Sequence, residues 1–122
     1  MSTNSNNESK KMIENITPIL YVRNIQESIT YYTDALGFNE DWTTNGFTGL
    51  SRDGWRIYLS EGGHGQPGMW LWIGVMDLDR LYQELQSKGA KIESEIESYE
   101  WAREFRVADL DGHILRFGGE PE

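Results

Sequence analysis

The chain contains no cysteine, which excludes disulfides, thiolate metal sites and cysteine nucleophiles. Positive charge is also scarce. There are 11 lysines and arginines against 20 aspartates and glutamates, so the net charge is −9. A balance of this kind disfavours nucleic acid and anionic membranes as partners, and it favours neutral or cationic small molecules.

Long hydrophobic runs are missing as well. No apolar stretch approaches the roughly 20 residues that a membrane-spanning helix needs. The segment MSTNSNNESKK at the start is polar and lacks the apolar core of a signal peptide. We therefore expect a disordered tail over residues 1–14 and a cytoplasmic protein with no membrane partner.

What the sequence does contain is a strand followed by a capped helix. Residues 16–22 alternate like a strand. Asn24 stands where a helix N-cap belongs, and Glu27 can complete a capping box. Apolar residues then recur at helical spacing until Gly37, which is typical of a helix C-terminus.

The same order returns in the second half of the chain. Residues 70–75 are predicted to be a strand, Asp77 caps the next helix and Gly89 ends it. The segments SRDGWRIYLSEGG and ADLDGHILRFGGE also match, because each has an Asp-Gly turn followed by an alternating strand. The chain is thus an internal duplication within one domain, residues 15–120, with modules at 15–61 and 69–119 joined by a glycine-rich linker at 62–68.

Strand parity separates the predicted sheets into two faces. One face is entirely apolar and should lie under the helices; it includes Leu20, Ile57 and Leu115, and Trp55 falls on it as a core residue. The other face mixes aromatic and polar side chains, including Arg116. Such a face is either the wall of a ligand site or an ordinary exposed sheet surface.

The segments ILYVRNIQESITYYTDALGF, GMWLWIGVMDLDRLYQEL and WAREFRVADLDGHILRF resemble the glyoxalase, bleomycin-resistance and extradiol-dioxygenase superfamily, also called vicinal oxygen chelate proteins. The resemblance covers residues 15–119. It implies an α+β fold of two βαβββ modules, each with a curled mixed sheet. The concave face of that sheet would hold the site, which is commonly completed across a homodimer. The glycine-rich linker would allow such a dimer to swap modules.

In the metalloenzymes of that superfamily, His, Glu or Gln side chains on the first and last strand of each module bind a divalent metal. The corresponding residues here are Thr17, Tyr58, Trp70 and Arg116. None is a plausible ligand, and Arg116 would repel a cation. This departure predicts a non-catalytic protein without a cofactor or a metal, similar to the bleomycin-resistance proteins, which are dimers that sequester a glycopeptide drug without altering it.

The candidate ligand-binding residues share the predicted open face or the loops at its edge. Aromatic rings would stack on a planar part of the ligand, and acids would balance its positive charge. They are Trp42, Phe47, Tyr58, Glu61, Trp70, Trp72, Tyr99, Trp101 and Arg116. Two further acids, Asp41 and Glu100, lie close in sequence to these aromatics. His64 and His113 are interpreted as a solvated linker residue and a turn residue.

Three functions compete at this point. The leading hypothesis is sequestration of a cationic, bleomycin-like antibiotic in the groove of a homodimer, giving resistance. The alternatives are a metal-dependent enzyme of the same superfamily, drawing carboxylates such as Glu61 or Glu104, and a binder of another metabolite. Arg116 can also be purely structural, paired with Asp109 or another acid.

Overall fold

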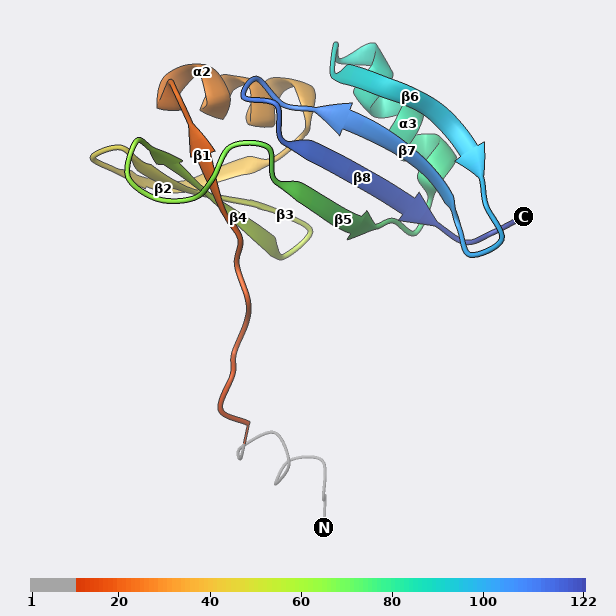
Figure 1. Ribbon diagram of the computed structural model, residues 1–122, viewed down its shortest axis with the longest axis horizontal. Helices are drawn as coiled ribbons and strands as arrows, with labels where there is room; N and C mark the ends of the chain where they lie inside the picture. The colour runs from red at the N-terminus through yellow and green to blue at the C-terminus, as the bar shows by residue number, and fades with distance from the viewer. Residues whose placement is uncertain (1–10) are drawn as a thin grey trace.

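The computed structural model describes residues 11–122, and two similar modules lie side by side in it (Figure 1). The first module consists of β1 (Ile19–Val22), α2 (Ile25–Thr30), the π-helix η1 (Tyr31–Ala35), β2 (Asn39–Thr44), β3 (Phe47–Arg52) and β4 (Trp55–Glu61). The second consists of β5 (Trp70–Gly74), α3 (Leu78–Ser87), β6 (Lys91–Ser98), β7 (Arg103–Ala108) and β8 (Ile114–Gly119). The predicted tail, residues 1–14, lies mostly outside the described residues.

Each module contains one four-stranded mixed sheet. The strand order is β1-β4-β3-β2 in the first module and β5-β8-β7-β6 in the second. In both, the first strand of the module runs parallel to the last, and the remaining neighbours are antiparallel. The predicted α+β fold of two βαβββ modules is therefore confirmed.

The helix boundaries follow the predicted caps at their starts. Asn24 Oδ1 accepts a hydrogen bond from the Glu27 backbone N–H at 3.0 Å, and Asp77 caps α3 in the same way. The first helix differs from the prediction, because its last turn is a π-helix rather than an α-helix. The Thr33 hydroxyl donates to the Ile29 carbonyl at 2.9 Å, which competes with the backbone hydrogen bonds of a regular α-helix.

The core lies between the helices and the apolar faces of both sheets. Its buried side chains come from both modules, for example Leu20, Leu59, Phe105 and Leu115. The assignment of Trp55 to this core is wrong, because its side chain is 79% exposed. Trp55 is the first residue of β4, directly after a hairpin turn. Its strand phase is that of a core residue, but no part of residues 11–122 covers the ring.

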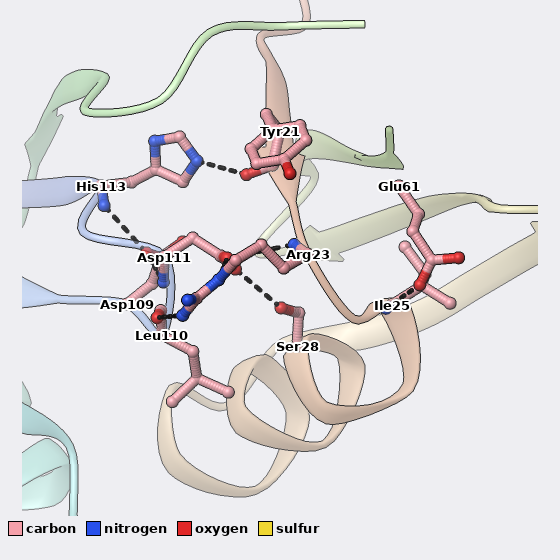
Figure 2. A network of polar contacts seen from close by, with 9 residues as sticks. All are labelled: Tyr21, Arg23, Ile25, Ser28, Glu61, Asp109, Leu110, Asp111 and His113. Atoms are coloured by element: carbon pink, nitrogen blue, oxygen red, sulfur yellow. Dashed lines mark hydrogen bonds and ion pairs between the residues drawn. The ribbon is translucent and has the colours of Figure 1, made fainter. Parts of the chain in front are cut away.

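A network of polar contacts joins the two modules (Figure 2). The Asp111 carboxylate, in the turn before β8, accepts hydrogen bonds from the backbone and the side chain of Arg23 at 3.0 and 2.9 Å. It also accepts one from the Ser28 hydroxyl of α2 at 3.3 Å. The end of β1 and the start of the first helix are thereby fixed to the last hairpin of the chain.

His113 is the buried centre of the same network. Its Nδ1 accepts a hydrogen bond from the Met69 backbone N–H at 3.0 Å, and its Nε2 lies 2.5 Å from the Tyr21 carbonyl oxygen. These two partners require a neutral ring with its proton on Nε2. The residue predicted to be part of a turn thus joins the linker, β1 and β8. Among residues 11–122, no helix is long and apolar enough to span a membrane.

Candidate functional site

Three aromatic rings gather on the first module, on the face of its sheet that is turned away from the helix. We call this side of each sheet the open face. Trp42 stacks on Phe47 with ring centroids 5.8 Å apart, and both rings meet Tyr58 edge to face at 5.2 and 5.5 Å. Phe47 and Tyr58 are partly buried, and Trp42 is 40% exposed. The cluster offers aromatic area for stacking, together with one phenol hydroxyl, that of Tyr58.

The orientation of Trp42 depends on the glycine across from it. Gly49 is the register partner of Trp42 on β3. A β-carbon at Gly49 would lie only 2.5 Å from indole atoms of Trp42. The ring can lie flat on the sheet only because this position has no side chain.

The second module repeats this arrangement with other strands. Trp72 of β5 lies across Gly118 of β8, where a β-carbon would overlap the indole. Gly74 lies under the other edge of the ring, at 3.2 Å for a β-carbon. Trp72 is nevertheless 57% exposed. Its ring therefore contacts the backbone on one side and presents area to solvent on the other.

Glu104 of β7 holds this indole in place. Its Oε2 accepts a hydrogen bond from Trp72 Nε1 at 2.9 Å, and its Oε1 accepts one from Arg116 Nε at 2.7 Å. Burial alone would raise the pKa of Glu104, but the hydrogen bonds from Trp72 and Arg116 outweigh it and lower the pKa below its usual value. Glu104 is thus an ionised carboxylate, 4% exposed, that fixes two candidate ligand contacts.

A cleft of about 760 Å³ opens beside this group. Trp72, Trp101, Glu104 and Arg116 line it, with Gly118 among the residues of its wall. Trp101 comes from the hairpin between β6 and β7, where it stacks on Tyr99 with ring centroids 4.8 Å apart. All lining residues belong to the second module or to the C-terminal segment after it.

A smaller cleft of about 530 Å³ belongs to the first module and the linker. Phe47, Glu61 and His64 line it. The Glu61 carboxylate is already engaged there, because its Oε2 accepts a hydrogen bond from the backbone N–H of Ile25 at the start of α2, at 2.9 Å. Within one chain, Phe47 of the first module and Trp72 of the second therefore line separate clefts.

A protein-family model matches most of the chain. The model described as Glyoxalase/Bleomycin resistance protein/Dioxygenase superfamily matches residues 13–117. The chain belongs to this superfamily. No curated protein sequence matches the chain significantly.

Several solved structures share the fold of this chain. The chain is 23% identical to the bleomycin-binding protein from Streptomyces verticillus, which was crystallised with copper(II)-bleomycin; the match covers 88% of this chain and 98% of that one, with a TM-score of 0.75. TnmS3, an antibiotic-binding protein from Streptomyces sp. CB03234, is 16% identical over 90% of this chain and 98% of its own, with a TM-score of 0.78.

A glyoxalase/bleomycin resistance protein/dioxygenase from Nocardioides is 18% identical over 98% of this chain and 93% of its own, with a TM-score of 0.73. At these identities the likeness shows the fold alone. The superfamily contains enzymes as well as binding proteins, so the question of catalysis turns on the residues of this chain.

Two of the residues predicted to stand at the metal positions of the superfamily, Tyr58 and Arg116, are engaged by other groups in the structure. Tyr58 packs in the aromatic cluster, and Arg116 donates to Glu104, so a fixed cation stands where a ligand would be needed. Glu61 and Glu104, the carboxylates of the alternative hypothesis, lie in different modules, and each is engaged by other groups. Within residues 11–122, no three His, Asp or Glu side chains are grouped to hold a metal ion.

Six of the predicted site residues form two groups, and the other three lie beside them. Trp42, Phe47 and Tyr58 form the cluster of the first module, while Trp72, Trp101 and Arg116 line the larger cleft. Trp70 also lies on the open face of the second module, where the Arg106 guanidinium sits 5.8 Å from its ring. Glu61 accepts a hydrogen bond from the first residue of α2, and Tyr99 stacks on Trp101.

The sequence did not identify which acid pairs with Arg116, or which residues orient the two indoles. Arg116 pairs with Glu104 rather than with Asp109, whose carboxylate accepts from the Tyr32 hydroxyl and from the backbone. Gly49 and Gly118 were not recognised as surfaces for tryptophans. One signal was available: glycine in a strand interior often marks a close approach of another group.

Proposed function

We propose that this protein binds a small molecule with a planar aromatic portion and sequesters it without chemical change. The observation that supports this most directly is the pair of flat tryptophans, Trp42 on Gly49 and Trp72 on Gly118. Glycine backbone under each ring and the Glu104 hydrogen bond to Trp72 hold these surfaces in position before a ligand arrives. Preorganised aromatic rings of this kind support stacking on a planar ligand. An indole ring is not a general acid, a general base or a nucleophile.

Bleomycin-type glycopeptide antibiotics are the first ligand class that we propose, with antibiotic resistance as the consequence. They combine a planar aromatic portion with positive charge, and the net charge of −9 favours the approach of a cation. The bleomycin-binding protein of similar fold makes this class a natural starting point.

We also propose that the functional unit is a homodimer. The aromatic cluster of the first module and the cleft of the second are separate within one chain. A dimer that sets one chain's first module against its partner's second would enclose a ligand between two aromatic walls. Light scattering coupled to size-exclusion chromatography measures the mass directly, and a monomer at working concentrations would reject the shared groove.

The test of function is a titration of metal-free bleomycin into EDTA-treated protein, followed by tryptophan fluorescence. Saturable quenching near one drug per chain is expected, with the drug recovered unchanged by mass spectrometry. Trp72→Phe should remove most of the response, whereas Trp55→Phe is the matched control because this exposed ring lies at a hairpin tip. A chemically altered drug would end the sequestration proposal, and absence of quenching would reject the bleomycin class.

A further inference from the structure

Two arginines lie next to each other on the open face of the second module. Arg116 of β8 is the register partner of Arg106 on β7, and Trp72 of β5 is the partner of Arg116 on its other side. The three side chains thus form one row across three neighbouring strands. Like charges directly opposite each other on a sheet are destabilising, so this pair is unfavourable unless negative charge lies close to it.

The charge of this row is only half balanced. Glu104 neutralises Arg116 through its Nε, at 2.7 Å. Arg106 has two described contacts, the Ser94 hydroxyl at 3.4 Å and the Trp70 ring at 5.8 Å, and neither carries a negative charge. Among the ion pairs formed within residues 11–122, none involves Arg106. The group of two guanidiniums and one carboxylate therefore keeps one positive charge.

The donors of these arginines are also incompletely used. Within the described part of the chain, only the Nε of each guanidinium makes a hydrogen bond. The terminal N–H groups remain, and these are the donors that bind a carboxylate in a two-pronged geometry. Arg106 is partly buried and rests on the Trp70 ring, which limits its freedom without changing its charge.

The flat indole of Trp72 stands in the same row as these donors. Neighbouring strands lie about 4.8 Å apart, so a ring stacked on Trp72 can place a substituent beside Arg116 and within reach of Arg106. The next row of side chains on this face contains the register partners Glu104 and Glu97, and both carboxylates have other partners than Arg106. Glu104 is engaged by Trp72 and Arg116, and the Glu97 carboxylate accepts from the Tyr99 hydroxyl at 3.4 Å.

We infer that this row is a subsite for an aromatic carboxylate, with the ring on Trp72 and the carboxylate on Arg116 and Arg106. The inference rests on the proposed aromatic binding and names the ligand chemistry at one of its two surfaces. A carboxylate has the opposite charge to the cationic ligands that the net charge of the chain favours. The two preferences arise from charge effects that act over different distances. Charges spread over the chain are screened beyond about 8 Å at physiological ionic strength, whereas the two arginines act at contact.

The experiment compares three probes with the same ring: 2-naphthoate, neutral 2-naphthamide and cationic 2-naphthylmethylamine. Each is titrated into the full-length protein labelled with ¹⁵N-tryptophan, and the indole N–H signal of Trp72 is followed by NMR, assigned with Trp72→Phe. We expect naphthoate to bind about tenfold more tightly than naphthamide, the difference that one charge-assisted hydrogen bond supplies. The amine should be the weakest of the three.

Arg106→Gln should remove this preference for naphthoate and leave naphthamide binding unchanged. The matched control is Arg80→Gln, which deletes the same charge from an exposed position on α3. Loss of the preference in both variants would show a general charge effect and overturn the subsite.

The outcomes separate this inference from the proposed function. Equal binding of all three probes, or tightest binding of the amine, would overturn the carboxylate subsite and leave aromatic binding intact. No shift of the Trp72 signal with any probe would overturn both. A preference for naphthoate that Arg106→Gln abolishes and Arg80→Gln keeps would establish the subsite.

Discussion

The indole of Trp72 lies directly on the backbone of Gly118, in space that a β-carbon would fill. Gly118→Ala should therefore lift or tilt the ring and break its hydrogen bond to Glu104. We expect a loss of stability of about 1–3 kcal/mol, as for other overpacked sites, and a shifted indole N–H signal for Trp72. Thermal unfolding and ¹⁵N NMR measure the two effects.

The control for that substitution is Gly63→Ala in the linker, where a new β-carbon meets nothing within 4 Å. This variant should leave the melting temperature and the Trp72 signal at their wild-type values. An unchanged Trp72 signal in Gly118→Ala would contradict the flat arrangement of the ring.

The Trp72 signal should also report the ionisation of Glu104. Because hydrogen bonds lower the pKa of this carboxyl in the folded protein, its stabilisation is fully present above the unfolded value, about 4.3, and is lost as the pH falls through the folded value. The indole signal should therefore be constant from neutral pH to about pH 5 and change only in more acid solution. In Glu104→Gln this acid-dependent change should be absent.

Glu95→Gln is the control for that titration, since Glu95 is exposed on β6. It should keep the wild-type response. The same acid transition in Glu104→Gln would show that another group titrates beside Trp72.

The elements that could be predicted from the sequence are those set by local patterns. Asn24 and Asp77 are recognisable as caps because a side-chain oxygen at that place satisfies a free N–H of the helix, and both make that bond. Strand alternation likewise assigns Leu20 and Leu115 to the core, where both are fully buried. The duplicated order of segments predicts the second module from the first, because the same pattern of strands, cap and helix recurs.

Local sequence patterns do not predict which side chains a helix covers, or which acid pairs with a given arginine. Trp55 has the phase of a core residue, yet periodicity does not say where a covering helix ends, and the ring is exposed. Arg116 has several acids near it in sequence, and only the strand register brings Glu104 rather than Asp109 to it. The contacts of Trp42 with Gly49 and of Trp72 with Gly118 join different strands, so the sequence of a single segment does not predict them.

A buried hydrogen bond between the modules gives a prediction for stability. Tyr32 is fully buried, and its hydroxyl donates to Asp109 Oδ2 at 2.9 Å. Burial and the nearby Asp109 raise the pKa of Tyr32, so the hydroxyl stays a donor even in alkaline solution. Tyr32→Phe leaves that carboxylate oxygen without this donor and should lower the free energy of unfolding by about 1–3 kcal/mol.

Urea denaturation measures this difference, and Tyr82→Phe is the control. Tyr82 packs its ring on Phe105 at 5.0 Å, and its hydroxyl makes no hydrogen bond within the described residues. The control should change the stability by less than about 0.5 kcal/mol, as a substitution away from a buried network does. Equal effects of the two substitutions would contradict the role of the Tyr32 hydroxyl.

His113 gives the last prediction, because its two ring nitrogens have different partners across the joint between the modules. Its Nδ1 accepts from the Met69 N–H, and its Nε2 donates to the Tyr21 carbonyl. His113→Asn keeps an acceptor near the place of Nδ1, whereas His113→Phe keeps the ring shape and removes both functions. The phenylalanine variant should lose about 1–3 kcal/mol for each buried group left unpaired, and the asparagine variant less. Hydrogen exchange at the Met69 amide separates the two cases: it should accelerate strongly in His113→Phe and modestly in His113→Asn, and equal exchange in both would show that the Met69 hydrogen bond does not hold the linker in place.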